Sequence, residues 1–300
     1  IVGVNDTPVA SDDQIVVSEE QILEAADTLL LANDTDVDHN SQLKVSGVVD
    51  SSSNNGALSY TSSSGRVVYN PVGKFDYLAE GDQEAATFTY SVADEYGATH
   101  QAQVDVTITG VNDAPVANQD TVSVSQNGSH TFDPTDNDTD VDLGDTRRVT
   151  SVSNPTANYG TAVLDPVTAR VTYSTGSGFD YLAHNEQASE TFSYTVEDRF
   201  NGTDQGNVVV TVTGVNDAPE AVDDVQYISE DSSKTFDPTL NDRDVDNGDV
   251  LHLASAELDS GARGEIEILA NGQINYDSSN KFDELPQGSS ATESLTYSVS

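Results

Sequence analysis

The chain has 300 residues, and its 52 acidic and 11 basic side chains give a formal charge of −41 at neutral pH. A charge of this sign and size repels nucleic acid and anionic lipid, which excludes a protein that binds phosphate backbones. Cysteine is absent, so disulfides and thiolate metal sites are excluded too. The sequence contains neither a signal peptide nor an apolar run long enough to span a membrane. We therefore expect no nucleic-acid partner and no membrane insertion.

The excess of acid allows three interpretations: disorder, solvation in high salt, or many bound cations. Disorder is disfavoured because apolar residues alternate in Val-, Tyr- and Phe-rich runs that can build a core. Calcium fits best, since hard cations need clustered carboxylate and carbonyl oxygens. An extracellular protein without disulfides also needs another source of stability, and a bound metal provides one.

Three copies of one unit follow one another along the chain. Asp34, Asp138 and Asp242 lie 104 residues apart, and a Gly-Val-Asn-Asp stretch heads each copy. The first two of these stretches are 107 residues apart, so the first copy carries three extra residues, expected within Glu20–Leu30. The predicted organisation is the end of a preceding repeat with its linker in 1–5, repeats in 6–112 and 113–216, and an incomplete repeat in 217–300.

Within a copy, apolar residues alternate with polar ones, which is the pattern of half-buried strands. In the first copy the clearest such runs are Phe88–Val92 and Val104–Ile108. The shorter predicted strands are Ile15–Val17, Thr28–Leu31, Leu43–Val49, Ala57–Tyr60 and Arg66–Tyr69. A single helical turn is predicted over Phe75–Ala79. About seven strands per copy, separated by Gly, Asn, Asp and Ser, predict an all-β fold of tandem Ig-like antiparallel sandwiches.

The third copy stops early. Tyr297–Val299 matches Tyr90–Val92, after which the first copy continues into its final strand. We therefore expect the third sandwich to lack its last strand, which leaves an open sheet edge. We also expect the chain to be a fragment of a longer array.

Each copy contains an acidic hexad of the form Asn-Asp-x-Asp-Val-Asp, namely Asn33–Asp38, Asn137–Asp142 and Asn241–Asp246. Carboxylates at alternate positions of an extended segment point to one side. At roughly 5 Å and an effective dielectric near 20, each pair costs about 3 kcal/mol without a cation. An EF-hand is excluded because its loop needs Gly at the sixth and Glu at the twelfth position, and the hexads have neither there.

The hexads need further ligands to complete a site. One source is the Asn-Asp pair that heads each copy, and the other is the acid that closes the Phe-x-Tyr-x-Val strand. The predicted Ca²⁺ ligands are Asn5, Asp6, Asp34, Asp36, Asp38, Asp94, Asn112, Asp113, Asp138, Asp140, Asp142, Asp198, Asn216, Asp217, Asp242, Asp244 and Asp246. A bridging ion at the linker would fix the angle between neighbouring domains. The alternative is that the hexads are solvated loops, because Asn and Asp favour turns.

Other chemistry has less support. The five histidines occupy non-equivalent places in the copies, and an active site would be unique to one copy, so we expect no enzyme. Tyr159, Tyr181 and Phe200 could stack on saccharide rings, although packing at the core or rim also explains each. A solvated strand edge equally explains the weaker acidic candidates, which are Asp12, Asp13, Glu19, Glu20, Asp120, Asp223 and Asp224.

Four runs carry a resemblance to a known family. Phe75–Gly81, Phe88–Asp94 and Gly110–Pro115 together resemble VCBS-type repeats, and Leu31–Asp38 is similar to their bacterial cadherin-like (tandem-95) variant. The resemblance covers the whole chain. It implies Ig- or cadherin-like β-sandwiches strung together in large RTX-type surface or secreted adhesins, often with calcium between domains.

The resemblance also implies roles for particular residues. In cadherins the downstream domain supplies an Asp-x-Asp and a later Asp, while the linker supplies Asn and Asp. At the first complete seam these roles fall on Asp138, Asp140, Asp198, Asn112 and Asp113, and at the second on Asp242, Asp244, Asn216 and Asp217. The chain departs from the cadherin pattern, because it lacks the upstream Asp-Arg-Glu motif and the second linker Asn. We therefore expect fewer ions per seam than in cadherins, or sites within one domain.

The expected function is that of a structural spacer, in which calcium-rigidified sandwiches project a terminal adhesive domain from a bacterial surface during cell adhesion or biofilm formation. The partners would be neighbouring repeats of the same chain, and the protein would act as an extracellular monomer, secreted or anchored at the outer membrane. The alternative is a carbohydrate- or protein-binding module whose partner is a surface glycan or protein.

Overall fold

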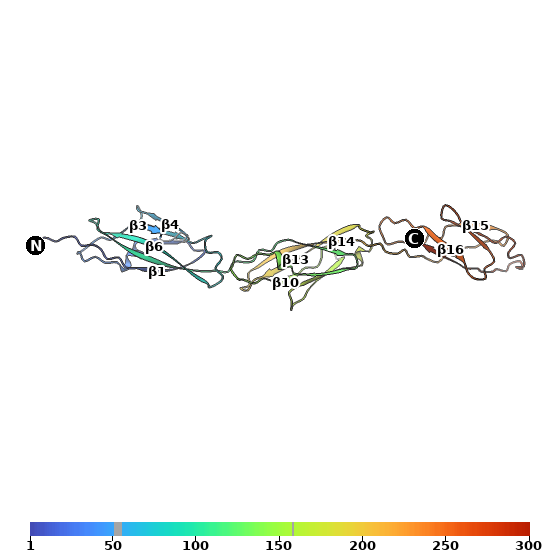
Figure 1. The fold of residues 1–300 in the computed structure, drawn as a ribbon, viewed down its shortest axis with the longest axis horizontal. Helices are drawn as coiled ribbons and strands as arrows, with labels where there is room; N and C mark the ends of the chain where they lie inside the picture. The colour runs from blue at the N-terminus through green and yellow to red at the C-terminus, as the bar shows by residue number, and fades with distance from the viewer. Residues whose placement is uncertain (51–55, 158) are drawn as a thin grey trace.

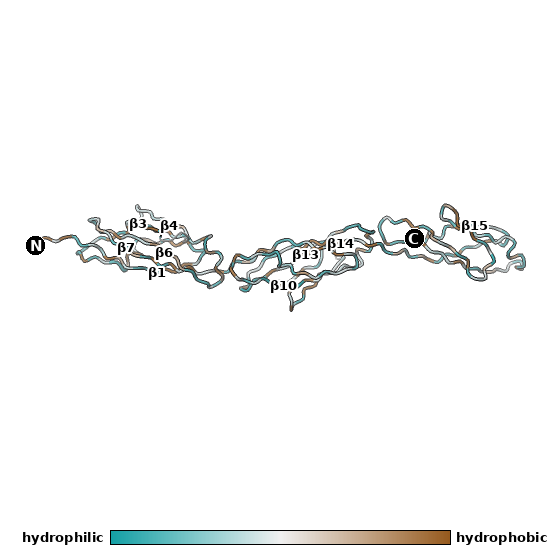
Figure 2. Tube along the Cα trace, viewed as in Figure 1, coloured by the Kyte–Doolittle hydropathy of each residue, from teal (hydrophilic) through white to brown (hydrophobic). Residues whose placement is uncertain are grey.

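Three β-rich domains follow one another along one axis in the computed structural model (Figure 1), which describes residues 1–50, 56–157 and 159–300. Figure 2 shows short hydrophobic stretches interspersed with hydrophilic ones along all three domains. Within the described ranges, no helix is long and apolar enough to cross a membrane. The all-β tandem architecture expected from the sequence is confirmed.

The described part of the first domain is a sandwich of seven strands. Its larger sheet has the order β1-β7-β6-β3, and its smaller sheet has the order β2-β5-β4. The strands are β1 (Asp13–Ser18), β2 (Leu23–Ala26), β3 (Lys44–Asp50), β4 (Ala57–Thr61), β5 (Arg66–Asn70), β6 (Gln83–Ala93) and β7 (Thr99–Thr109).

The second domain repeats this arrangement, with sheets of order β10-β13-β14-β8 and β11-β12-β9. Its strands are β8 (Asp120–Ser125), β9 (Ser129–Phe132), β10 (Arg148–Val152), β11 (Gly160–Leu164), β12 (Val171–Thr175), β13 (Gln187–Glu197) and β14 (Thr203–Thr213). Two 3₁₀ turns accompany them, η2 (Pro134–Asn137) and η3 (Ser177–Phe179). The matched order of the two domains confirms that the repeat in the sequence is a repeat of the fold.

The core of each complete domain comes from the predicted alternation. Phe88, Tyr90 and Val92 of β6 are buried, and so are Val104, Val106 and Ile108 of β7, while the residues that alternate with them are only partly buried. The same face of β13 and β14 is buried in the second domain. Period-two burial of large apolar side chains therefore holds the two sheets together.

One predicted strand is wrong. Thr28–Leu31 is not extended: α1 (Asp27–Leu30) and η1 (Leu31–Asn33) occupy this segment, and the strand lies just before it at β2. A strand would have buried Thr28 together with Leu30, whereas the helical turn buries Leu30 and leaves Thr28 and Leu29 exposed. Ala25 pairs with Val67 as Phe132 pairs with Val171, so the three extra residues of the first copy follow Ala25.

The predicted helical turn over Phe75–Ala79 is a hydrogen-bonded turn, closed by the Leu78 amide on the Phe75 carbonyl at 2.8 Å. It is not a helix within the part of the chain that the structure describes. Its second-domain counterpart is preceded by η3, and the Leu182 amide there bonds the Phe179 carbonyl at 3.0 Å. The segment thus keeps the predicted sharp turn with less helix than expected.

The first strand of each complete domain departs from the antiparallel expectation. β1 pairs with β7 in parallel, and β8 pairs with β14 in the same way. Parallel strands end at the same edge of a sheet, so Glu19, directly after β1, lies beside the exit of β7. The Glu19 amide donates to the Thr109 carbonyl at 3.0 Å. This pairing brings the beginning of a domain to the seam with the next one.

The third domain has fewer paired strands, as expected. Its sheets are β15-β18-β17 and the two-stranded β16-β19. The strands are β15 (Ser233–Phe236), β16 (Leu253–Leu258), β17 (Glu265–Ile268), β18 (Ile274–Asp277) and β19 (Leu295–Val299). The segment 224–229, which corresponds to β1 and β8, forms no strand because no following strand pairs with it. Among the described residues of this domain, the buried apolar side chains are Ile274 and Phe282.

Gly110, the residue that follows β7, sits against the turn at Leu78. A Cβ at Gly110 would lie 2.3 Å from the Leu78 carbonyl oxygen and 2.4 Å from that of Ala79. The Gly110 amide also donates to the Asp82 carbonyl at 2.8 Å. Backbone atoms cannot yield to a methyl group as a flexible side chain can, so the seam motif needs glycine for close approach.

We predict that Gly110→Ala lowers the free energy of unfolding of the first domain by about 1 to 3 kcal/mol, the usual cost of overpacking. Gly3 holds the same place in its motif, but nothing lies within 4 Å of its Cβ position. Gly3→Ala is therefore the matched control and should leave stability unchanged. Urea denaturation of both variants checks this; equal midpoints would contradict the packing argument.

Candidate metal centres at the domain seams

The linker after each Gly-Val-Asn-Asp motif pairs with the hexad of the domain it enters. Val116 and Thr139 exchange two backbone hydrogen bonds of 2.8 and 3.1 Å. The same isolated bridge joins Val9 to Thr35 and Glu220 to Arg243. The bridge fixes the hexad beside the linker that carries the Asn-Asp pair.

The first aspartate of each hexad lies away from the seam. Asp138 Oδ1 accepts hydrogen bonds from the Tyr194 hydroxyl at 2.8 Å and from the Asn118 amide at 2.7 Å, within the second domain. Asp34 takes the corresponding bonds in the first domain. Asp242 does so in the third. The structure therefore places Asp34, Asp138 and Asp242 as partners of a strand tyrosine.

A downstream group of acids forms where the second domain meets the linker. Asp140, Asp145 and Asp198 each place a carboxylate oxygen within 4.8 Å of the others. Asn112 joins them, because its Nδ2 donates to Asp198 Oδ2 at 3.0 Å. Asp198 Oδ1 is already held by the backbone amides of Phe200 and Gly202, which orients its second oxygen toward the group.

Three oxygens of this downstream group are buried without a hydrogen-bond partner: Asn112 Oδ1, Asp140 Oδ2 and Asp145 Oδ2. Burial, and then neighbouring charges that include Asp145 and Asp198, raise the pKa of Asp140. Arg199 Nε lies 4.0 Å from Asp145 Oδ1 and offsets part of the charge. Unpaired oxygens that converge are costly unless a cation binds them.

A second, upstream group lies on the side of the first domain. Glu19, only 2% exposed, accepts the Val111 amide on Oε1 at 2.8 Å, while its Oε2 has no partner. Burial first, and then the charges of Asp113, Asp142 and Asp76, raise the pKa of Glu19 to about 7. Asp142 Oδ2 accepts the Asp113 amide at 3.0 Å, and its Oδ1 is again unpaired.

Burial also raises the pKa of Asp142 to about 6, with further contributions from Asp140, Asp113 and Asp145. The pKa of Asp113 is raised for the same primary reason and then by Asp76, Glu20 and Asp140. The upstream group thus joins acids from the first domain, the linker and the second domain.

Apart from the linker and these acids, one backbone hydrogen bond joins the described residues of the two domains at this seam. The Leu143 amide donates to the Tyr77 carbonyl at 2.9 Å, and the Asn247 amide repeats this bond to Tyr181 at the next seam, at 2.8 Å. A single backbone bond and a linker constrain the interdomain angle weakly. The acidic groups are therefore well placed to determine it.

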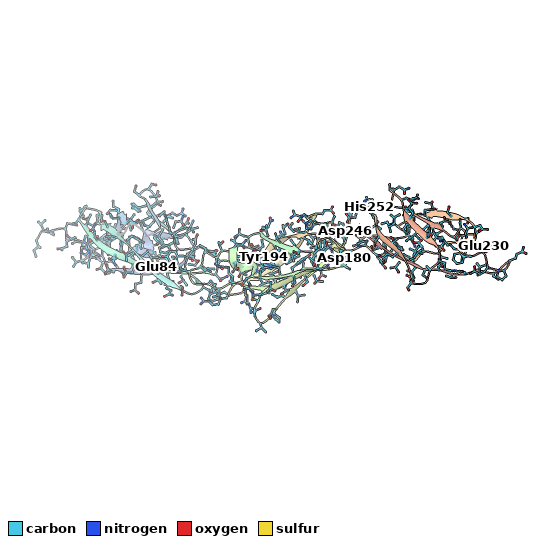
Figure 3. The ribbon with its side chains drawn as sticks, turned by 45° about the vertical axis from the view of Figure 1, so that its right-hand side comes forward. Glu84, Asp180, Tyr194, Glu230, Asp246 and His252 are labelled. Carbon is cyan, nitrogen blue, oxygen red and sulfur yellow. The ribbon has the colours of Figure 1, made fainter. Side chains whose placement is uncertain are left out.

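The second seam holds a related acidic group, in which Asp244 and Asp249 correspond to Asp140 and Asp145, and Asp246 corresponds to Asp142. Asp244, Asp246 and Asp249 place oxygens within 4.8 Å of one another. The Asp217 amide donates to Asp246 Oδ2 at 2.8 Å, and Asp246 Oδ1 is buried without a partner. Figure 3 labels Asp246 of the third domain and Asp180 of the second, both at the junction of these two domains. Asn216 differs from Asn112: the side-chain amide Nδ2 of Asn216 donates to the Asp217 carbonyl, whereas that of Asn112 donates to Asp198.

The first copy carries a similar arrangement at its N-terminal end. Asn5 Nδ2 donates to Asp94 Oδ2 at 2.8 Å, and the Asp6 amide donates to Asp38 Oδ2 at 2.8 Å. The Asp38 amide in turn bonds Asp36 Oδ1 at 2.9 Å. The linker and hexad of the first copy therefore meet as they do at the two seams.

Sequence reasoning missed two of the acids at the first complete seam and ranked a third as weak. Asp145 follows Gly144, and the pair recurs as Gly248 and Asp249 at the repeat spacing, a signal that could have identified it. Glu19 was ranked as weak, because only the parallel pairing of β1 brings it to the seam. Asp76, with Asp180 as its counterpart, has no local signal beyond that repetition.

The donor set fits a hard cation. Both groups at the first complete seam consist of carboxylate and amide oxygens, without imidazole or thiolate, and calcium takes six to eight such oxygens in irregular geometry. Asp140, Asp145, Asp198 and Asn112 would hold one ion, with the unpaired oxygens as its ligands.

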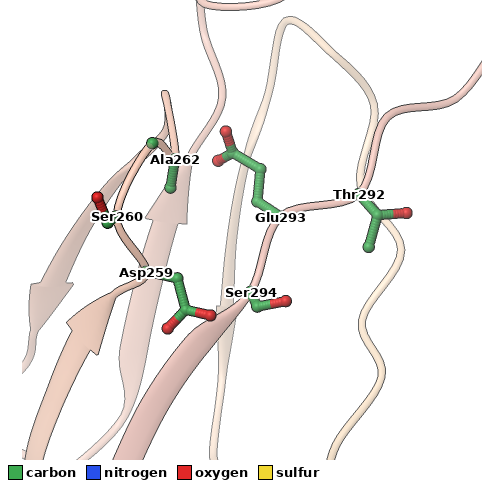
Figure 4. A pocket seen from close by; sticks show the side chains of 7 residues that line it. Asp259, Ser260, Ala262, Thr292, Glu293 and Ser294 are labelled. Atoms are coloured by element: carbon green, nitrogen blue, oxygen red, sulfur yellow. The ribbon is translucent and has the colours of Figure 1, made fainter.

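One pocket of the structure lies in the third domain, away from the two seams' acidic groups described above. It has a volume of about 240 Å³, and its walls are Asp259–Ala262 and Thr292–Ser294 of the third domain (Figure 4). None of these lining residues is aromatic or histidine, so the pocket has no stacking platform for sugars. Tyr159 packs edge-on against Phe179 at 5.3 Å, and Arg199 lies over the Phe200 ring at 4.4 Å.

We predict that, in the presence of a chelator, the thermal midpoint falls as pH rises from about 4.5 to about 7. The raised pKa of Glu19 means that the folded chain binds more protons than the unfolded chain in this window, so folding stability is lost as the proton leaves. Glu19→Gln should weaken the fall, whereas the exposed control Glu267→Gln should not. Equal falls in both variants would contradict the assignment.

The sequence model of the bacterial cadherin-like domain matches residues 5–110, 112–214 and 216–300. Domains of this family are of an adhesion type and not enzymatic. A search of curated proteins found no match.

Several cadherin structures are similar to the chain. Human CDH23 domains EC21–23 share 15% identity over 96% of this chain and 97% of that one, with a TM-score of 0.49. Protocadherin gamma B7 extracellular domains 1–4 share 19% identity over 99% and 76%, with a TM-score of 0.47. Drosophila N-cadherin EC1–4 shares 14% over 95% and 68%, with a TM-score of 0.42. On the strength of the family match along nearly its whole length, the chain belongs to the bacterial cadherin-like domain family and contains three tandem matches to it.

Proposed function

We propose that this chain is a calcium-rigidified extender region of a bacterial extracellular adhesin. The observation that carries the proposal is the convergence of buried carboxylate and amide oxygens without partners at a seam between two domains. Among the described residues, a linker and one backbone hydrogen bond join those domains across the seam. Stiffness of the array then depends on whether a cation offsets the repulsion among these carboxylates.

Backbone amides hold two of the seam carboxylates in fixed orientations. The backbone amides of Phe200 and Gly202 hold Asp198, and the Asp113 amide holds Asp142. A calcium ion bound there supplies positive charge shared by several oxygens. The linker acids and the hexad acids would then be fixed to each other, and the angle between the domains would be fixed with them.

The wider context is part of the same proposal. Tandem adhesion-type domains and a large negative charge support an extracellular spacer, since millimolar calcium outside cells saturates weak sites. The resemblance of Phe75–Gly81 and Gly110–Pro115 to VCBS-type repeats supports a large RTX-type adhesin that acts in surface attachment or biofilm formation. The terminal domain that it would project lies outside these three repeats.

We predict that calcium in excess raises the thermal midpoint of the first seam's domains by roughly 10 °C relative to chelator, since a ligand at 100 times its Kd stabilises a fold by about 2.7 kcal/mol. Small-angle scattering should show a longer, narrower distribution of maximum dimensions with calcium. Identical melting and scattering with and without chelator would contradict the proposal.

The double variant Asp140→Asn, Asp145→Asn should lose most of the calcium response while remaining folded, because it removes two charges that repel in the apo state. Asp231→Asn removes one exposed charge next to Glu230, which lies at the outer end of the third domain (Figure 3). This control should keep the full response to calcium.

A further inference from the structure

The two seams differ in charge at equivalent positions. Glu19 and Gln126 both donate their amide to the last strand, to Thr109 and Thr213 respectively, which establishes their equivalence. By the same register Glu20 corresponds to Asn127. Glu80 corresponds to His184, because the residues after them, Gly81 and Asn185, donate to Gly110 and Gly214. Three carboxylates on the upstream side of the first complete seam are thus two amides and an imidazole at the second.

The Glu19 and Gln126 pair shows what this exchange does. One oxygen of each side chain accepts the same linker amide: Glu19 Oε1 from Val111 at 2.8 Å, and Gln126 Oε1 from Val215 at 3.2 Å. The other atom differs. Gln126 Nε2 donates to Asp217 Oδ2 at 2.7 Å, whereas Glu19 Oε2 is buried without a partner.

This difference has a simple electrostatic meaning. Glu19 carries a buried oxygen without a partner, and the charges of Asp113, Asp142 and Asp76 act on this side chain. At the second seam the Gln126 amide supplies a donor hydrogen at that place. A cation there would lose one carboxylate ligand and would face an N–H group.

We infer that the two seams have different cation requirements: the first complete seam needs a cation in the Glu19, Asp113 and Asp142 group, and the Gln126 amide replaces that cation at the second seam. The second seam then holds one ion fewer and keeps its linker closed without it. The array consequently has joints of unequal calcium dependence. This inference rests on the proposed function, because it assumes that calcium occupies the seams.

The test uses the whole chain, in which the absence of cysteine allows unique spin-label sites. Val16→Cys with Val163→Cys reports on the first complete seam, and Val163→Cys with Ile268→Cys reports on the second; all three residues are exposed. Double electron–electron resonance gives the width of each distance distribution in calcium and in chelator. Equilibrium dialysis counts the bound calcium.

Glu19→Gln should remove one bound calcium per chain and make the width at the first complete seam less dependent on calcium. Gln126→Glu should add one bound calcium and broaden the second seam in chelator. The two seams also differ in that Asp198 has no counterpart among the residues of the third domain. The decisive comparison is therefore made within the first complete seam, between Glu19→Gln and the wild type.

The inference would be overturned if calcium still ordered both seams but neither variant changed the number of bound calcium ions or the widths of the distance distributions. A wild-type chain that bound no calcium, with equal widths in calcium and chelator, would instead overturn the proposed function. If Gln126→Glu failed to fold, the stoichiometry of Glu19→Gln would still decide, because that variant removes an unpaired buried charge and should fold.

Discussion

Repulsion among carboxylates at the domain seams is the constraint on which the rest of this structure depends. At the first complete seam, acids from the first domain, the linker and the second domain converge, and several of their oxygens are buried without a partner. Burial and mutual repulsion raise the pKa of Glu19, Asp113, Asp140 and Asp142 together. A group of this kind is unstable alone and strongly stabilised by a cation, so it can make domain orientation depend on the ionic environment.

Three features of the backbone place these acids at the seam. Parallel pairing of β1 with β7 brings Glu19 to the edge where the chain leaves the domain. Because Gly110 has no side chain, the segment that leaves the domain packs closely against the turn at Leu78. The bridge between Val116 and Thr139 then holds the hexad of the next domain beside the linker. Because the same features recur at the second seam, the upstream sides of the two joints differ by the identity of their side chains.

Much of this could be predicted from the sequence, because it depends on local periodicity and on repetition. Alternation located β6 and β7, and the repeat spacing identified Asp140, Asp198 and Asn112, which the structure brings together. The role of Asp138 could not be predicted, because Asp138 and Asp140 are equivalent in the sequence pattern. They differ only in the fold, where the hydroxyl of Tyr194 donates a hydrogen bond to Asp138. Glu19 was undervalued because its place depends on a pairing between segments about ninety residues apart.

The central claim is that cations occupy the seam between the first two domains. A crystal structure of the full chain grown in millimolar calcium, with anomalous diffraction collected to locate calcium, tests it most directly. Anomalous peaks are predicted among Asp140, Asp145 and Asp198 and beside Glu19, Asp113 and Asp142, with the unpaired oxygens as ligands. A well-ordered seam with side chains in these positions and no anomalous peak at either place would contradict the account.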